Sequence, residues 1–418
     1  METFPPRRKG KRWIAVFLLA MAIVHMIVLW QDRELMASGY GDFSAFYTAG
    51  LMLRQGMSHQ LYSPEAQWRM QQEFAQVVTI RQGPMPYVRP PFEALVFLPL
   101  AYFSYPTALA IWSVLKIGIL YYALSTLQET GIQPLYPPWL EVVLCLGFFP
   151  VFLDLYQGQD SLLLFSLVAV ALRNLYLQRD SSAGAVLALG LFKFHLVIPL
   201  LAMLSLVGRP RILRGFLPVG MALVAISVGV AGADVLKSYP AYLFELNHAA
   251  GVGMVTAQSM PNLRGLLTSM VGRAPYPGPV HWILLPLAIV ALAGAVWIWR
   301  RDRGPHRLVL GYSLALVTTI VTSYYSYTYD LILLLVPALV LGGRFSQQSQ
   351  SWTANDRFTI CILLLLICSP LYWFLILHLD RPYLVAILVL LLALGIAHLM
   401  SLSSVRRFGL HSRRSFVP

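Results

Sequence analysis

Charged side chains are scarce in this chain of 418 residues. They make up 12% of the sequence, whereas hydrophobic residues make up 58% and the mean hydropathy is +0.66. So little polar surface cannot cover so much apolar mass, which excludes a soluble globular protein. The composition predicts an all-α polytopic membrane protein whose main surroundings are the lipid bilayer.

Acidic residues are the scarcer of the two charged classes. The chain has 18 Asp and Glu against 31 Lys and Arg, a formal net charge of +13. The basic residues stand in short clusters between apolar runs rather than along one face. This pattern reports membrane topology, and it excludes nucleic acid as a partner.

Cysteine is almost absent. Cys145, Cys361 and Cys368 lie inside apolar segments without metal-ligand spacing, which excludes a disulfide framework and a zinc site. The chain also lacks a P-loop, a Gly-x-Ser-x-Gly elbow and a His-Glu-x-x-His motif. No Asp-x-Asp pair occurs either, so we expect neither a metal nor a cofactor.

Apolar runs dominate what remains. A spanning helix needs about 20 apolar residues, fewer where neighbours cover its ends. Twelve stretches fit this rule, near residues 13–30, 106–126, 138–153, 161–177, 184–194, 196–208, 215–232, 280–299, 308–323, 330–343, 358–377 and 382–402. The first follows five basic residues and lacks a small-residue cleavage site, which predicts an uncleaved anchor with a cytoplasmic N-terminus.

The distribution of basic residues tests this topology. If successive spans cross the membrane in alternate directions from a cytoplasmic N-terminus, 20 of the 31 Lys and Arg residues lie in the cytoplasm and nine in the longer outer loops, with Lys116 and Lys193 inside apolar segments. The asymmetry requires that the apolar stretch 91–103 does not cross, so we predict a re-entrant or interface-lying helix there. We expect one membrane domain over 1–402 and a basic cytoplasmic tail over 403–418.

Three outer regions could hold a site. The first outer loop, 31–105, contains Asp42 and an amphipathic segment, 65–78, with an apolar face suited to the headgroup layer (Met70, Phe74, Val77 and Val78). The second region is the short turn 154–160. The third, 233–279, is the second large outer loop and carries His248 and Arg264.

Several short motifs follow one another in order. They are Gly41-Asp42-Phe43, Leu61-Tyr62-Ser63-Pro64, Tyr87-x-Arg89-Pro90-Pro91-Phe92 followed by Leu98-Pro99-Leu100-Ala101, Gly158-Gln159-Asp160, and Ala183-Gly184 leading to Phe192-Lys193. Together they resemble glycosyltransferase family 87, the polyprenyl-phosphate-mannose-dependent α-mannosyltransferases of the GT-C fold. The order and spacing of the motifs carry the resemblance.

The resemblance implies a sugar, mannose, transferred with inversion from a polyprenyl phosphate to a glycolipid or glycan acceptor. It implies the bacterial inner (plasma) membrane, with the active site on the non-cytoplasmic face. Asp42 matches the family's catalytic aspartate, and a carboxylate near the acceptor hydroxyl serves as general base. Cations would stabilise the leaving phosphate, with Arg89, Lys193 and Arg264 as candidates. Candidates for binding sugar or acceptor are Gln159, Asp160, His195, His248, Tyr327 and Asp330.

Each candidate also has a structural interpretation. Asp42 is suited to cap a helix, and Asp160 to stabilise a turn. Lys193 could snorkel to the interface, although an ammonium between apolar segments favours pairing or an aqueous cavity. Histidines such as His195 and His248 are often structural. The tyrosines of 323–330 could form an interface belt, and the histidine that family members often carry near this point is missing here.

Two other function classes stay open. A secondary transporter or lipid flippase would also have about twelve spans, but the two halves show no paired repeat. The short segments 184–194 and 196–208 are the only hint of interrupted helices. A non-catalytic membrane protein would not need Asp42.

Overall fold

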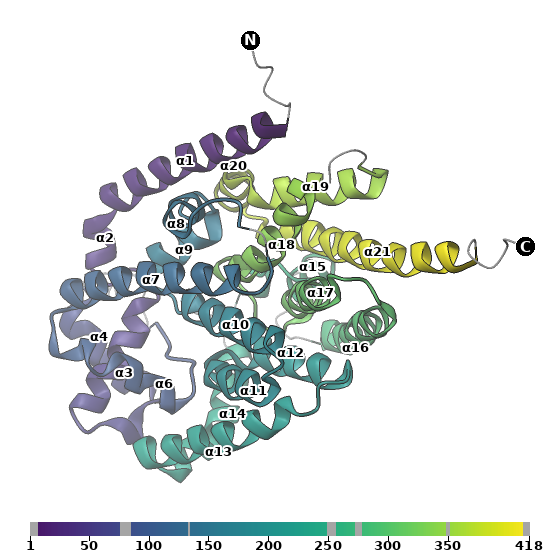
Figure 1. Cartoon of the computed structure of the whole chain (residues 1–418). Coiled ribbons are helices and arrows are strands. Elements are labelled where there is room, and N and C mark those ends of the chain that lie inside the picture. The colour runs from purple at the N-terminus through teal and green to yellow at the C-terminus, as the bar shows by residue number, and fades with distance from the viewer. Residues whose placement is uncertain are drawn as a thin grey trace, which may run out of the picture.

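The computed structural model describes residues 7–75, 85–132, 134–248, 256–271, 278–347 and 352–412. Within these ranges the chain forms helices joined by turns and contains no β-strand, which confirms the all-α class. Figure 1 shows the helices packed as one bundle, with α1 along one edge.

The helices of the N-terminal half are α1 (Arg7–Gln31), α2 (Arg33–Ala37), α3 (Phe43–Arg54), η1 (Ser58–Gln60), α4 (Pro64–Phe74), α6 (Pro91–Phe97), η2 (Leu100–Tyr102), α7 (Tyr105–Gln128), α8 (Pro138–Cys145), α9 (Phe149–Gln157) and α10 (Ser161–Tyr176). Those of the C-terminal half are α11 (Asp180–Leu189), η3 (Gly190–Lys193), α12 (Phe194–Leu206), α13 (Ile212–Ala231), α14 (Ala233–His248), η4 (Ala257–Ser259), α15 (Leu263–Val271), α16 (Gly278–Arg301), α17 (Arg307–Thr322), η5 (Thr328–Leu334), α18 (Leu335–Gln347), α19 (Ala354–Ile367), α20 (Ser369–Trp373), η6 (Phe374–His378), η7 (Pro382–Leu384) and α21 (Val385–Ser412). Proline in the first turn starts α4, α6, α7 and α8, where its missing N–H is not needed.

By length and composition alone, seven helical runs among the described residues could cross a membrane: Gly10–Gln31, Tyr105–Gln128, Asp180–Leu206, Ile212–Ala231, Val280–Arg301, Thr328–Ser346 and Pro382–Ser401. Two pairs bent by 76° and 61°, α8 with α9 and α19 with Ser369–His378, raise the number to nine. The apolar helices α10 and α17 have only 16 residues each. The chain is a multi-pass membrane protein, while the predicted count of twelve spans stays unconfirmed.

The run Asp180–Leu206 turns back on itself. Arg209, just beyond its end, donates to the carboxylate of Asp180 at its start over 2.7 Å. A straight helix of this length would separate its ends by about 40 Å. The break is at Lys193, whose ψ of 55° is not helical. Thus α11 and α12 form a hairpin with both ends on one side and Lys193 at its tip, where the sequence predicts two short spans.

Small residues bring α13 against this hairpin. A Cβ added to Gly184 would meet the carbonyl oxygen of Ile212 at 1.8 Å, and one added to Gly215 would meet that of Ser181 at 1.8 Å. Close backbone approach at glycine is a common way to pack membrane helices. The Ala183-Gly184 motif therefore fixes how α13 supports the hairpin.

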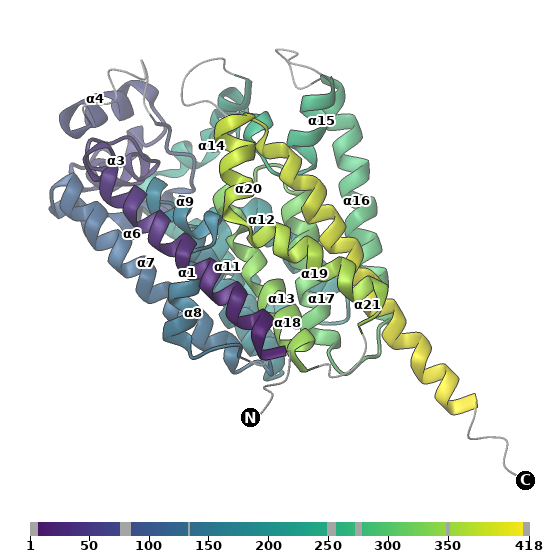
Figure 2. The ribbon, with the colours of Figure 1, turned by 90° about the horizontal axis from the view of Figure 1, so that it is seen from above.

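Helices α2, α3, α4 and α6 form a layer at one end of the molecule. Figure 2 shows α4, α14 and α15 at the end opposite both chain termini. In this layer the aromatic rings of α3 and α6 stack, with Phe46 and Phe97 at 4.8 Å. Helix α6 has seven residues, a rise of about 10 Å, and is too short to cross a bilayer. Val77 and Val78 of the predicted amphipathic face lie outside the described residues.

Candidate active site

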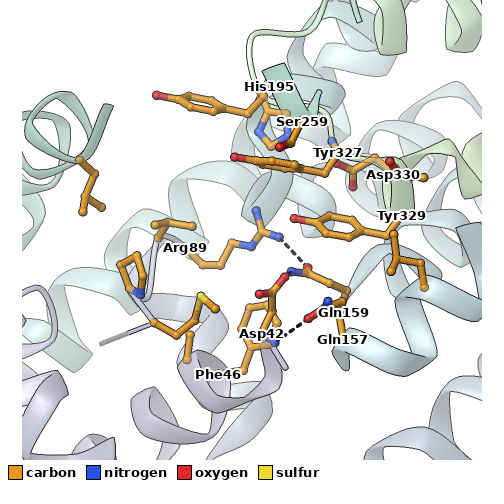
Figure 3. A pocket seen from close by; sticks show the side chains of 18 of the residues that line it. Asp42, Phe46, Arg89, Gln157, Gln159, His195, Ser259, Tyr327, Tyr329 and Asp330 are labelled. Atoms are coloured by element: carbon orange, nitrogen blue, oxygen red, sulfur yellow. Dashed lines mark hydrogen bonds between the residues drawn. The ribbon is translucent and has the colours of Figure 1, made fainter. Parts of the chain in front are cut away.

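A cavity of about 460 Å³ lies between the layer of α2, α3, α4 and α6 and the rest of the bundle. Six of the predicted site residues line it: Asp42, Arg89, Gln159, His195, Tyr327 and Asp330. One apolar part of its wall comes from α9, the hairpin, α14 and η6: Leu153, Phe192, Phe194, Leu243, Leu246 and Ile376. Figure 3 shows Asp42, Arg89 and the tyrosine rings around one common space.

Asp42 precedes α3 in the N-cap position, but its side chain makes no capping hydrogen bond. Instead, Gln159 Nε2 donates to Asp42 Oδ2 over 2.6 Å, and the backbone N–H of Asp42 donates to Gln157 Oε1 over 3.3 Å. The start of α3 is thereby tied to the α9–α10 turn. The carboxylate faces the cavity rather than its own helix (Figure 3).

Arg89 forms an ion pair with Asp160 and contacts both of its carboxylate oxygens. Its Nε and Nη2 atoms lie 3.0 Å from Oδ2 and Oδ1 of Asp160, and Nη2 also donates to Gln159 Oε1 over 3.4 Å. Burial alone would raise the pKa of Asp160, but Arg89 and Lys193 outweigh burial and hold that pKa well below its usual range. Asp160 is 0% exposed, so it lies beneath the cavity wall and fixes Arg89 in it.

Lys193 completes this ion cluster from the tip of the hairpin. Its Nζ atom lies 2.7 Å from Asp160 Oδ1, 2.5 Å from Asp330 Oδ1 and 2.5 Å from Ser161 Oγ. The side chain is 0% exposed and does not reach the interface. Two carboxylates therefore explain how an ammonium is accommodated between two apolar half-helices.

The tyrosine segment forms another wall. The backbone N–H of Tyr327 donates to Asp330 Oδ2 over 3.0 Å, which fixes the start of η5. Ser161 Oγ donates to Asp330 Oδ1 over 3.0 Å, so both oxygens of this carboxylate are engaged. The rings of Tyr327 and Tyr329 lie 5.7 Å apart and face the cavity (Figure 3).

The remaining predicted residues, His195, Arg264 and His248, do not share one location. His195 lines the cavity, with its ring 6.0 Å from that of Tyr325. Arg264 is 4% exposed and lies against the tyrosine segment, with its guanidinium 3.9 Å above the ring of Tyr324. His248 ends α14, and its side chain lies outside the described residues.

The sequence model of glycosyltransferase family 87 matches residues 87–323, more than half of the chain. The chain belongs to glycosyltransferase family 87. Searches of curated proteins and of solved structures give no match. The matched range holds Arg89, Asp160 and Lys193, whereas Asp42 precedes it and Asp330 follows it.

A pair of tyrosines in this glycosyltransferase was not predicted as part of the site. Tyr62 donates its hydroxyl proton to Arg89 O over 2.8 Å, and Tyr239 of α14 donates to Val88 O over 2.9 Å. Their rings stack at 5.0 Å. This tyrosine clamp, Tyr62 and Tyr239, holds the backbone that carries Arg89. Tyr62 stands in a recognised motif, but no sequence signal links it to Tyr239.

Three further buried charged residues, Glu93, Lys116 and Asp154, were not predicted as part of the site. Glu93 of α6 is 1% exposed and lies 3.9 Å from Arg89 Nε. Lys116 of α7 pairs with Asp154 at 3.0 Å, and both side chains are 0% exposed. The available signal was a charged residue within an apolar stretch, which holds for Glu93 and Lys116 alike.

In the parts of this glycosyltransferase that the structure describes, no three His, Cys, Asp or Glu side chains gather as a metal site. The expectation of a metal-independent enzyme stays a prediction.

Proposed function

We propose that the chain transfers mannose from a polyprenyl phosphate to an acceptor hydroxyl, with inversion, on the non-cytoplasmic face of the bacterial inner membrane. The observation that supports this is the link between a carboxylate and a cation at one cavity. Gln159 accepts from Arg89 and donates to Asp42, so one amide sets the spacing of the two groups.

Asp42 acts as general base in this proposal. The acceptor oxygen attacks the anomeric carbon from the face opposite the phosphate, and the acceptor's proton passes to Asp42. The bond between the anomeric carbon and the phosphate oxygen breaks, and the electron pair stays on that oxygen.

Arg89 stabilises the departing phosphate, because a fixed cation in a water-poor site favours the developing negative charge. Lys193 and Asp160 act one layer behind it by fixing the guanidinium. Arg264 supports the tyrosine segment from outside the cavity wall. It would contact the phosphate only if the bound donor extended toward α15.

The sugar and the lipid use different walls. The rings of Tyr327 and Tyr329 and the amide of Gln159 offer stacking and hydrogen bonds to the pyranose and its acceptor, beside His195 and Asp330. Leu243, Leu246 and Ile376 give the prenyl chain an apolar path. This arrangement belongs to the single membrane domain proposed over 1–402, with 403–418 as a cytoplasmic tail.

A transfer assay tests the proposal. Purified protein in nanodiscs is incubated with radiolabelled polyprenyl-phosphate mannose and native membrane glycolipids. We expect labelled glycolipid from the wild-type protein and none from Asp42→Asn. Movement of the intact donor across a vesicle membrane without transfer would instead identify a flippase.

A further inference from the structure

Glu93 is a buried carboxyl group that the proposed reaction does not use. Its Oε2 atom lies 3.9 Å from Arg89 Nε, and Asp160 Oδ2 lies 3.0 Å from the same nitrogen. Glu93 is 1% exposed and Asp160 is 0% exposed. Two carboxyl groups therefore meet at one guanidinium in a buried site.

Both groups lie against the same nitrogen, Arg89 Nε, and are therefore close to each other. Ionised carboxylates only accept hydrogen bonds, so a hydrogen bond between the two groups would require a proton on one of them. Glu93 Oε1 and Asp160 Oδ2 are buried, and neither is hydrogen-bonded to an N–H or to a hydroxyl in the described parts of the chain. A proton between the two groups would satisfy both atoms.

The position of the cations decides which group keeps the proton. Asp160 contacts both Arg89 and Lys193 at 3.0 and 2.7 Å, whereas the ion-pair contact of Glu93 is with Arg89 alone at 3.9 Å in the described chain. Burial and the charge of Asp160 raise the pKa of Glu93 well above its usual range, more than Arg89 lowers it. Asp160 is therefore the ionised partner.

The charge balance gives this proton a consequence. In the described cluster Arg89 and Lys193 are balanced by Asp160 and Asp330. Ionising Glu93 would make the cluster net negative beside Asp42. An anionic phosphodiester would then be repelled at short range in a poorly screened site.

We propose that Glu93 is a positioning residue that stays protonated, donates a hydrogen bond to Asp160 and so keeps the positive charge of Arg89 available to the donor phosphate. The part concerning phosphate rests on the proposed function. The part concerning the proton does not, and the two are tested separately.

Infrared spectroscopy of the full chain in nanodiscs tests the proton. We expect the carbonyl band of a protonated carboxylic acid at neutral pH in the wild-type protein and its loss in Glu93→Gln. The matched control is Glu141→Gln, because buried Glu141 accepts backbone N–H groups of Leu135 and Tyr136 over 3.1 and 3.2 Å, as an ionised carboxylate does. A wild-type spectrum without the band, or a band that survives Glu93→Gln, overturns the proposal.

Binding of polyprenyl monophosphate to the same proteins tests the second part. Glutamine is neutral and keeps an N–H donor for Asp160, so Glu93→Gln should bind this probe within about threefold of wild type. A larger loss would show that the ionised carboxylate is needed, and it would overturn the role of Glu93 whether or not the protein transfers mannose.

Discussion

At the residue scale, the capping and catalytic interpretations of Asp42 predict different results for one substitution. Asparagine keeps the shape of the side chain and an oxygen for Gln159 Nε2, but it cannot accept a proton. Asp42→Asn should therefore leave the fold and donor binding intact and lower transfer by about a hundredfold or more. The measurement is turnover with polyprenyl-phosphate mannose, beside thermal unfolding of both proteins.

Asp32→Asn is the matched control for this substitution. Asp32 lies ten residues before Asp42 and accepts a hydrogen bond from Tyr156 over 3.0 Å, but it does not line the cavity. It should keep nearly full turnover. Normal transfer by a well-folded Asp42→Asn protein would refute the role of Asp42 as base.

Lys193→Ala should act first on stability. The substitution leaves Asp330 without its cation in a buried site, and breaking a buried pair in this way costs about 3–5 kcal/mol. Lys193→Met combined with Asp330→Asn removes both charges, while Asp160 keeps Arg89. This balanced variant should recover most of the lost stability but transfer more slowly than wild type, because the support behind Arg89 is gone. Thermal unfolding and turnover separate the two effects.

The pair Lys116 and Asp154 provides the comparison for this experiment. It is equally buried but does not contact Arg89. Lys116→Met with Asp154→Asn should recover both stability and turnover. If Lys193→Ala unfolds at the wild-type temperature, the ion cluster does not hold the hairpin tip.

The cavity residues that could be predicted from the sequence are side chains whose type is unusual for their position. Asp42, Arg89 and Lys193 could be singled out because charge is costly in a membrane protein. Gln159, Asp160 and Asp330 were also predicted, but as sugar- or acceptor-binding residues. Their pairing with these three side chains could not be predicted, because it depends on which helices meet. Glu93 was visible as a carboxylate in an apolar stretch, but only the fold shows that it faces Asp160.

At the element scale, α14 acts on the site through the tyrosine clamp. Tyr239→Phe keeps the ring stacked on Tyr62 and removes the hydroxyl that holds Val88 O. A lost hydrogen bond of about 0.5–1.5 kcal/mol should raise the KM for the donor about two- to tenfold and change kcat less. Steady-state kinetics with varied donor measures this split.

Tyr242→Phe is the control, because Tyr242 also stacks on Tyr62, at 4.9 Å, but its hydroxyl accepts from Gln67 over 3.4 Å instead of holding Val88. Its donor KM should stay near wild type. Equal effects of both variants would mean that the stack, and not the hydroxyl of Tyr239, positions Arg89.

Helices were predictable from the sequence where the length of an apolar run is enough to identify them. The positions of the long apolar helices followed from their hydrophobic runs. The hairpin differed: the sequence predicts two short spans at 184–194 and 196–208, whereas α11 and α12 form a structure that enters and leaves on one side. Local sequence does not record that α13 and the ion cluster hold such a turn in place.

At the scale of the whole molecule, topology makes a separate prediction. Both termini should be cytoplasmic and 31–105 should lie outside, as the distribution of basic residues indicates. In a protein without native cysteines, Ser104→Cys should react with a membrane-impermeant maleimide on intact cells. Ser182→Cys, at the start of the hairpin, should react only after permeabilisation. Labelling of Ser104→Cys from the cytoplasm alone would contradict the outer placement of 91–103.

The length of the hairpin also sets the position of Lys193. Helix α11 rises by about 15 Å over its ten residues, and the four residues of η3, which end at Lys193, add about 8 Å. One inserted residue would move the ammonium about 1.5 Å and turn it by about 100°, away from both carboxylates. The length of α11 is therefore as strictly constrained as the identity of Lys193. An insertion in α11 should disrupt the ion cluster, whereas an insertion in a loop should be tolerated.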